Sequence, residues 1–183
     1  MKMKEMIALL LILFSFGLPL FSIEISTRPA KKEDIHVLYD LICELAVFEG
    51  KDLASLPLTK ENLYERGFGE SPYFFVEVAE LENKVVGYAL YFYGFSAHQG
   101  SPLLYVDDLY VKEKYRGQGI GTRLLKQLAC YAKQQHCCRL EWHVFDWNKS
   151  GIAFYEKLDA DLRKDLILVR LEKDPMDRLA VND

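Results

Sequence analysis

The sequence predicts one α/β domain in which a mixed β-sheet carries helices on its faces. Half of the 183 residues are hydrophobic, which suits a single domain with a substantial core and excludes a disordered chain. Segments rich in β-branched and aromatic residues interleave with segments whose apolar residues recur at helical spacing. A strand over residues 103–111 also runs into a glycine-rich turn and an amphipathic stretch. Interleaved strands and helices are typical of an α/β sheet covered by helices.

In the N-terminal third of the chain, the sequence predicts one strand and two helices. Residues 23–28 alternate as a strand does, and Pro29 ends the alternation. Residues 32–49 place apolar side chains at the spacing of an amphipathic helix. Thr59 is a suitable N-cap for a short helix over residues 59–67.

A β-hairpin is predicted next. Residues 73–80 and 85–93 are rich in β-branched and aromatic residues, as strands are. The Glu82-Asn83 pair between them has the length and polarity of a hairpin turn.

The remaining elements alternate between strand and helix. We predict strands over residues 103–111, 139–145 and 166–171, and helices over residues 120–136 and 148–158. The complete order is strand, two helices, three strands, helix, strand, helix and strand.

The charge and the metal-binding residue types argue against two classes of partner. A formal net charge of −4 gives no general attraction to nucleic acid. No Cys-x-x-Cys pair occurs and the four histidines do not repeat at metal-ligand spacing, so we expect no metal site. The cysteines fit free thiols in a reducing compartment; they are Cys43, Cys130, Cys137 and Cys138.

An apolar leader precedes the predicted domain. Lys2 and Lys4 come before an apolar run over residues 6–21, which resembles the charged region and hydrophobic core of a signal peptide. The run is short for a membrane-spanning helix, which needs about 20 apolar residues. No Ala-x-Ala-like cleavage site follows it. Residues 1–22 therefore have three interpretations: an export signal, a membrane anchor, or translation from an upstream start codon.

The loop over residues 116–121 reads Arg-Gly-Gln-Gly-Ile-Gly. Glycines at every second position let the backbone turn sharply and approach a ligand closely. The helix that follows directs its free N–H groups and the positive end of its dipole at an anion. The spacing differs from the Rossmann pattern Gly-x-Gly-x-x-Gly, and the P-loop lysine is missing. The loop predicts an anion site, and the alternative is a turn that only starts a helix.

Two adjacent aspartates, Asp107 and Asp108, stand in the apolar strand before that loop. Because side chains alternate along a strand, we expect the two carboxylates to point to opposite faces of the sheet. Asp107 is then placed to receive a cation, whereas for Asp108 a structural hydrogen bond is the alternative. The alternation predicts Leu103, Tyr105, Asp107, Leu109 and Val111 on one face, and Leu104, Val106, Asp108 and Tyr110 on the other.

Two further polar residues lie within the predicted helix over residues 148–158. Asn148 has the right type for its N-cap. Tyr155 is either a core aromatic or a functional residue, because the neighbours Phe154 and Tyr155 cannot face the same way.

These segments together resemble the GNAT superfamily of N-acetyltransferases, and within it the spermidine/spermine (diamine) N-acetyltransferases. The resemblance runs from about residue 25 to residue 171, and residues 116–121 match the superfamily's acetyl-CoA loop, Arg/Gln-x-x-Gly-x-Gly/Ala. The more specific motifs are Arg28-Pro29-Ala30, Glu44-Leu45-Ala46 with Phe48-Glu49, Gly67-Phe68-Gly69-Glu70, Leu104-Tyr105-Val106-Asp107-Asp108-Leu109, and Asp146-Trp147-Asn148 followed by Phe154-Tyr155.

The resemblance implies the GNAT fold, with a mixed and mostly antiparallel central sheet. It also implies acetyl transfer from acetyl-CoA to a primary amine, by direct attack in a ternary complex and without a metal. Tyr155 and Asp107 match the family's catalytic residues, and Glu49, Asp107 and Asp108 are implied to bind the amine. The cofactor-binding residues that it implies are Leu109, Val111, Arg116, Gly117, Gln118, Gly119, Ile120, Gly121, Asn148 and Tyr155.

The chemistry of these residues suits the implied roles. An alkylammonium, with a pKa near ~10.4 like that of lysine, must lose a proton before its nitrogen can attack. Asp107 can accept that proton directly or through water, while Glu49 holds a distal ammonium. Tyr155 can give its hydroxyl proton to the departing thiolate.

Three residues depart from the family's pattern. Asp107 is one methylene shorter than the usual glutamate, Gln99 stands about where an aromatic residue packs on long polyamines, and Asp159 replaces a common glycine. The substrate therefore stays open among diamines, polyamines and lysine-like amines such as thialysine. A protein lysine or N-terminal acetyltransferase and a non-catalytic acyl-CoA-binding sensor are the alternative functions.

The resemblance also implies a homodimer. Because acetyl-CoA is a cytosolic metabolite, we expect a cytoplasmic protein and disfavour the export signal, although membrane contact through residues 6–21 stays open. We divide the chain into the leader at 1–22, the N-acetyltransferase domain at 23–175 and a C-terminal tail at 176–183.

Overall fold

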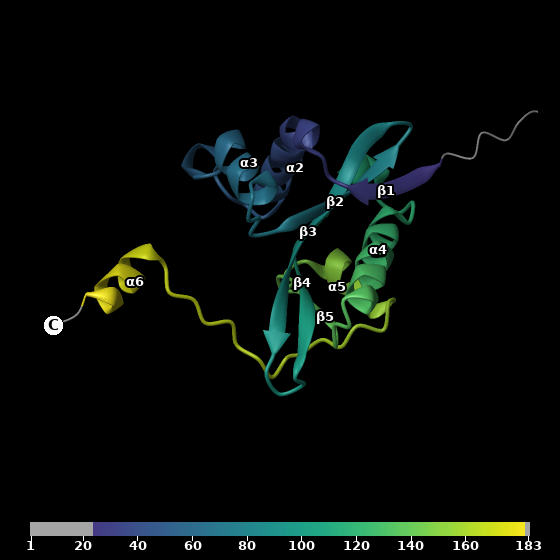
Figure 1. Ribbon diagram of the computed structural model, residues 1–183. Coiled ribbons are helices and arrows are strands. Elements are labelled where there is room, and N and C mark those ends of the chain that lie inside the picture. The colour runs from purple at the N-terminus through teal and green to yellow at the C-terminus, as the bar shows by residue number, and fades with distance from the viewer. Residues whose placement is uncertain (1–23, 182–183) are drawn as a thin grey trace, which may run out of the picture. The chain divides into compact units, whose positions relative to one another are not determined.

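The computed structural model of the protein describes residues 24–181 and contains a five-stranded sheet in the order β1-β2-β3-β4-β5 (Figure 1). The first four strands pair antiparallel, and β4 pairs parallel with β5. This arrangement confirms the predicted mixed, mostly antiparallel sheet. The leader at residues 1–22 lies outside the described residues. The strands are β1 (Ile25–Pro29), β2 (Phe75–Leu81), β3 (Lys84–Ser96), β4 (Ser101–Val111) and β5 (Leu140–Glu141).

The described residues divide into two compact units, residues 24–142 and residues 143–181. The sheet belongs to the first unit, together with α2 (Ile35–Phe48), α3 (Lys60–Phe68) and α4 (Ile120–Gln134). The second unit contains α5 (Lys149–Glu156) and α6 (Lys173–Ala180). Three short 3₁₀ turns lie at Lys32–Asp34, Leu53–Ser55 and Glu113–Tyr115.

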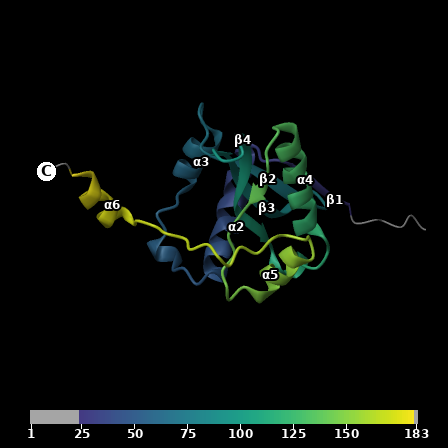
Figure 2. The ribbon, with the colours of Figure 1, turned by 90° about the horizontal axis from the view of Figure 1, so that it is seen from below.

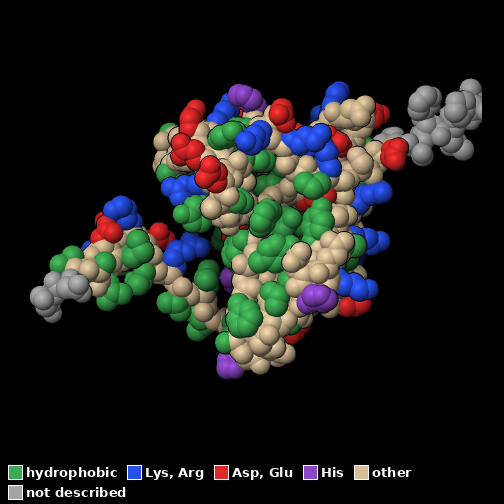
Figure 3. Space-filling model, viewed as in Figure 1, with side chains coloured by type: hydrophobic (Ala, Val, Ile, Leu, Met, Phe, Trp, Pro, Cys, Tyr) green, Lys and Arg blue, Asp and Glu red, His purple; other side chains and the backbone are tan. Residues whose placement is uncertain are grey.

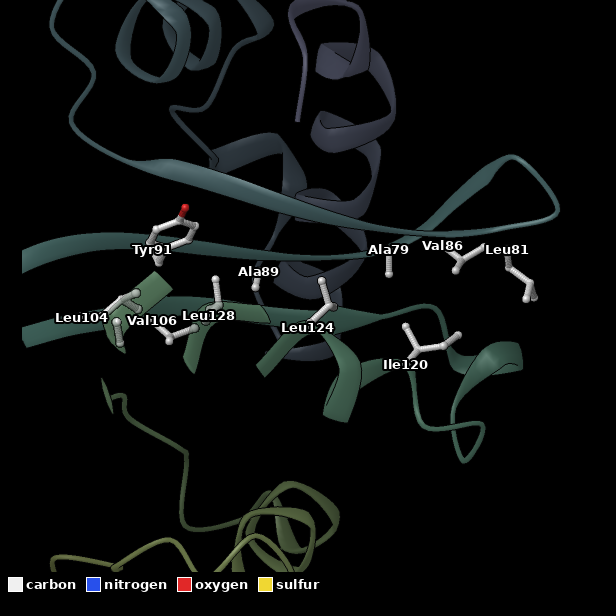
Figure 4. Close-up of a cluster of buried hydrophobic side chains, with 11 residues drawn as sticks. Ala79, Leu81, Val86, Ala89, Tyr91, Leu104, Val106, Ile120, Leu124 and Leu128 are labelled. Carbon is white, nitrogen blue, oxygen red and sulfur yellow. The ribbon is translucent and has the colours of Figure 1, made fainter. Parts of the chain in front are cut away.

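Helices cover both faces of the sheet in the first unit, with α4 on one face and α2 with α3 on the other (Figure 2). On the α4 face, apolar side chains of the sheet meet those of the helix (Figure 4). The buried members of this cluster are Ala79, Leu81, Val86, Ala89, Tyr91, Leu104, Val106, Ile120, Leu124, Leu128 and Ala132. The buried members on the α2 face are Ile35, Leu38, Leu41, Leu63, Val76, Val78, Tyr88, Leu90 and Tyr110.

Two predicted local signals are confirmed. Glu82 and Asn83 both have positive φ, 51° and 61°, as the two central residues of a tight hairpin turn require. Thr59 caps α3, because its hydroxyl accepts a hydrogen bond from the Asn62 N–H at 3.1 Å. The Asn62 side chain in turn accepts from the Thr59 N–H at 3.1 Å, which closes a reciprocal cap.

Two predictions for the C-terminal third are wrong. The strand predicted over residues 139–145 is reduced to the two residues of β5, and residues 166–171 form no strand. A strand needs a neighbour to satisfy its backbone groups, which periodicity within one segment does not reveal. Helix α6 was not predicted and spans the proposed tail boundary at residue 175.

The predicted face assignment of β4 is also wrong, because the strand contains a β-bulge. Leu90 pairs with Asp108 and Tyr91 pairs with Val106, so Asp107 has no partner in β3. The extra residue restarts the alternation of side chains. Leu104 and Val106 therefore lie in the α4-side cluster and Tyr110 in the α2-side cluster, although the alternation put all three on one face.

Candidate active site

The glycine loop joins β4 to α4 and leaves backbone N–H groups free. Gly117 and Gly119 have φ values of +77° and +81°, and a Cβ added to either would meet no atom within 4 Å. Gly119 is the N-cap of α4 and provides no side-chain cap. The first intrahelical bond runs from the Arg123 N–H to the Gly119 carbonyl at 3.0 Å, so the amides before Arg123 precede the helical ladder. This open, amide-lined turn fits a diphosphate.

The Arg116 side chain connects this loop to the end of α2. Its Nε donates to the Val111 carbonyl at 2.9 Å. Its guanidinium lies over the Phe48 ring at 5.1 Å and the Tyr110 ring at 5.5 Å from the centroids. Phe48 is the last residue of α2, so one arginine links the anion loop to the helix end that carries Glu49.

The edge of β4 is open beside the bulge. The parallel pairing with β5 consists of Leu104 with Leu140 and Tyr105 with Glu141, and within residues 24–181 no strand continues it. Asp107 lies just beyond that pairing and its side chain is exposed. Leu109 and Val111 direct their side chains into the α4-side cluster. Their backbone groups at this edge are then left for a ligand, except for the Val111 carbonyl, which accepts from Arg116.

Three carboxyl groups interact near the bulge. Burial raises the pKa of Glu49, Lys51 lowers it, and the charge of Asp107 raises it again. Burial also raises the pKa of Asp108 to about 6, with further contributions from Asp107 and Glu49. The bulge therefore places the charge of Asp107 beside groups on the α2 face, where simple alternation predicted that the two aspartates would separate.

The Asp108 carboxylate has a tyrosine partner that the sequence did not indicate. The Tyr88 hydroxyl, on β3, donates to Asp108 Oδ2 at 2.9 Å. This bond opposes the effect of burial on the pKa of Asp108. The structural hydrogen bond considered for Asp108 thus exists, and its donor is a tyrosine hydroxyl.

Asn148 and Tyr155 lie in the second unit. Asn148 is the N-cap of α5, since its Oδ1 accepts from the Gly151 N–H at 2.9 Å. Tyr155 lies on α5 with 9% of its surface exposed, and burial raises its pKa to about 12. Its hydroxyl is therefore protonated at neutral pH and can act as a proton donor. Asp159, just after α5, adopts a φ of 57°, a conformation that glycine takes at less cost.

Comparison with known proteins identifies the family. Residues 36–160 match the acetyltransferase (GNAT) family. The chain belongs to the GNAT family. It is 38% identical over 141 residues to the thialysine N-epsilon-acetyltransferase of Bos taurus, covering 73% of this chain and 82% of that protein.

Two further comparisons agree with this assignment. The spermidine/spermine N(1)-acetyltransferase-like protein 1 of Homo sapiens is 33% identical over 135 residues, which are 70% of this chain and 19% of that protein. An integron cassette protein from the mobile metagenome of V. cholerae superposes with a TM-score of 0.72 at 26% identity, covering 86% of this chain and 98% of that one. The predicted family and the predicted enzyme class, an N-acetyltransferase, are confirmed.

The first unit of this GNAT enzyme has one more feature that sequence reasoning missed. A hollow beside α2 is lined by residues that include Cys43, Glu44, Tyr110, Lys112 and Arg116. Glu44 closes one side, accepting from the Lys112 ammonium at 2.6 Å and from the Tyr110 hydroxyl at 3.1 Å. The motif that contains Glu44 was noted in the sequence, but its partners come from β4, which only the fold brings near.

Within residues 24–181, no helix has the length and apolarity to cross a membrane. In the same residues, no group of three or more histidine, cysteine, aspartate or glutamate side chains could hold a metal ion.

Proposed function

We propose that this GNAT enzyme transfers the acetyl group of acetyl-CoA to a primary amine of a small diamine, polyamine or lysine-like molecule. The amine attacks directly in a ternary complex. The observation that carries this proposal is the set of three carboxyl groups, Glu49, Asp107 and Asp108, at the bulge of the strand that feeds the glycine loop. An ammonium group is the ligand that such a set attracts.

The glycine loop supplies the binding site for the co-substrate. The backbone amides of residues 117–121 are suited to hold its pyrophosphate, and the open edge of β4 is suited to pair with an amide-containing chain. Acetyl-CoA supplies an activated acyl group on a thiol leaving group. Positioning the two substrates side by side accounts for much of the expected rate.

The amine must reach the thioester unprotonated. Asp107 is exposed at the bulge and can take the proton directly or through water. Glu49 can hold the second cationic end of a diamine or of a lysine-like amino acid. Because the charge of Asp107 raises the pKa of Glu49, a dication bridging the two groups relieves a repulsion that already exists.

Tyr155 completes the proposed chemistry as the general acid. Its raised pKa, about 12, keeps the hydroxyl protonated in the range where a thiolate needs a proton. The family resemblance supports this role for Tyr155 and a cofactor contact for Asn148.

The names of two relatives support a smaller set of candidate amines. One acts on thialysine by name, and another is named for its likeness to spermidine/spermine acetyltransferases. The shorter carboxylate at Asp107 and the glutamine at Gln99 favour a compact amine over a long polyamine. We therefore rank lysine-like amines and short diamines above spermine.

We further propose a cytoplasmic homodimer. Aromatic side chains of β2 and β3 are exposed and contact one another, and hydrophobic side chains gather over the sheet in Figure 3. Phe75 and Tyr93 are 42% and 38% exposed and lie 6.0 Å apart at their ring centroids. Exposed apolar areas of this kind are typical of subunit interfaces.

The proposed function is tested by acetyl-CoA consumption across a panel of amines, with Tyr155→Phe beside the wild type. We expect turnover of lysine-like amines or diamines and a loss of roughly 10²-fold or more in Tyr155→Phe. Binding of acetyl-CoA without turnover of any amine would favour the sensor, and turnover of peptides alone would favour a protein acetyltransferase. Full activity in Tyr155→Phe, where chemistry limits the rate, would remove the acid assignment.

A further inference from the structure

Tyr88 is a buried polar residue with no role in the chemistry described so far. It lies on β3 within the α2-side cluster and is 0% exposed. A buried phenol requires a hydrogen-bond partner, and the partner of Tyr88 is Asp108 Oδ2 at 2.9 Å. Burial, and after it the charge of Asp108, raise the pKa of Tyr88 well above 10. Tyr88 therefore stays protonated and always donates.

The bulge at Asp107 makes this contact possible. Tyr88 pairs with Tyr110 and Leu90 pairs with Asp108, so Asp108 shares the face of Tyr88. Without the extra residue, Asp108 would share the face of Leu104 and Val106, which pack toward α4. One irregularity thus exposes Asp107 and turns Asp108 toward the tyrosine.

The groups that act on Asp108 come from three elements. Tyr88 comes from β3, Asp107 from its own strand, and Glu49 from the end of α2. Burial, Asp107 and Glu49 all raise the pKa of Asp108, and among the causes only the Tyr88 hydrogen bond lowers it. The Tyr88 hydrogen bond is therefore the interaction that favours the ionised form of Asp108.

We propose that Tyr88 is a positioning residue for acetyl transfer, whose hydrogen bond keeps Asp108 ionised and in place to take up the proton that the substrate ammonium loses. The inference rests on the proposed function, because it assigns a second acceptor to the same site. Asp107 contacts the ammonium, and Asp108 behind it receives the proton.

The proton transfers balance. An N–H bond of the ammonium breaks, and the proton passes through Asp107 or a water molecule to an oxygen of Asp108. The freed electron pair of the nitrogen forms the C–N bond at the thioester carbonyl, and the C–S bond breaks with its electrons on sulfur. Tyr155 protonates that sulfur and recovers a proton from the second N–H. Asp108 then returns its proton to solvent, and no group is oxidised or reduced.

The test is the pH dependence of kcat/KM for Tyr88→Phe, with Tyr131→Phe as the matched control. Tyr131 also donates its hydroxyl to a buried carboxylate, that of Glu77 at 3.0 Å, but on the α4 face. In the wild type we expect kcat/KM to fall as the pH drops below about 6, where Asp108 takes up a proton. In Tyr88→Phe this acidic limb moves up by roughly one pH unit, because the carboxylate has lost a hydrogen bond.

Three results would overturn the proposal: an unshifted limb in Tyr88→Phe, an equal loss of activity at every pH, or an equal shift in Tyr131→Phe. Asp108→Asn provides a second variant, and its profile should lack the acidic limb near pH 6. A limb near pH 6 that persists in Asp108→Asn belongs to another group and also overturns the proposal.

A measurement that needs no turnover separates this inference from the proposed function. The ¹³C resonance of the Asp108 carboxyl can be followed as a function of pH without substrates. The midpoint of this titration should lie at higher pH in Tyr88→Phe than in the wild type. If the wild type acetylates no amine, the proposed function fails and the reaction role of Tyr88 fails with it, whatever the titration shows. If amines are acetylated and the Asp108 titration is the same in both proteins, the inference alone fails.

Discussion

The two faces of the sheet each hold a carboxyl group that accepts a hydrogen bond from a tyrosine hydroxyl. On the α4 face, Tyr131 donates to Glu77 at 3.0 Å, and on the α2 face, Tyr88 donates to Asp108 at 2.9 Å. Burial is the largest cause that raises the pKa of both carboxyls. The local chemistry is therefore nearly the same.

The surroundings of the two carboxyls differ. Glu77 is 0% exposed, and its Oε1 has no hydrogen-bond partner of ordinary length among the described residues. Besides Tyr131, the Thr27 side chain and the charge of Arg28 act on it, and both lower its pKa. Asp108 stands next to an exposed Asp107 and responds to Glu49. A carboxyl that is fully buried in the core affects the stability of the protein. A carboxyl that interacts with exposed charged groups can also take part in a reaction. The contrast shows that the groups around each carboxyl, more than its hydrogen bond to a tyrosine, determine what that carboxyl can do.

The largest expected effect is that of Asp107→Asn. The change removes the carboxylate proposed to contact the ammonium and take its proton first, and it keeps the size of the side chain, so kcat/KM for the amine should fall by roughly 10²- to 10⁴-fold. Steady-state kinetics measure this loss, and the affinity for acetyl-CoA, measured by calorimetry, should stay close to that of the wild type. Glu77→Gln is the matched control on the other face, and an equal loss in both variants would erase the contrast between the faces.

Tyr131→Phe should be the next largest effect, and it concerns stability. The change takes away the hydrogen bond to the fully buried Glu77, which we expect to cost about 1–3 kcal/mol of unfolding free energy. Urea unfolding at pH 8 measures the cost. A stability equal to that of the wild type would mean that the core supplies Glu77 with another partner.

Glu77→Gln should stabilise the protein in a pH-dependent way. The folded state raises the pKa of Glu77, so the wild type is most stable below the ordinary pKa of the group and loses stability as the pH rises through the folded-state value. Glutamine stays neutral and still accepts from Tyr131. The variant should gain roughly 1–2 kcal/mol at pH 8 and almost nothing at pH 4. Thermal unfolding at both pH values checks this, and a gain independent of pH would contradict the ionisation argument.

Glu49→Gln is expected to give the smallest effect. Because Glu49 is only partly buried and is proposed to hold the distal end of the substrate, KM for a dicationic amine should rise by roughly tenfold, with kcat little changed. A monoamine of similar length serves as the control substrate and should show a smaller rise. An equal rise for both amines would place Glu49 outside the binding of the second cation.

Much of the first unit could be predicted from the sequence, because its signals are local. The hairpin turn at Glu82 and Asn83, the cap at Thr59 and the glycine loop each rest on residues that are close in sequence. The bulge could not be predicted, since nothing within residues 103–111 marks an extra residue, which shows only against β3. Tyr88 was missed for the same reason: its partner lies 20 residues away and comes within reach through that bulge.

The segment over residues 166–171 shows the opposite failure, a strand that the sequence predicts and the structure lacks. Its composition is that of a strand, yet it forms none, and four of its hydrophobic side chains are more than 60% exposed. A strand is a property of two paired segments, so composition alone cannot decide whether one forms.

The bulge in β4 separates the residues that pack the core from the residue proposed to act on the substrate. Packing of β3 and β4 against both helical layers is carried by the paired residues, while the unpaired Asp107 takes no part in either cluster. A substitution at position 107 can therefore change the side chain offered to the substrate without rebuilding the interior. The same feature makes position 107 a natural place for a designer to retune the enzyme.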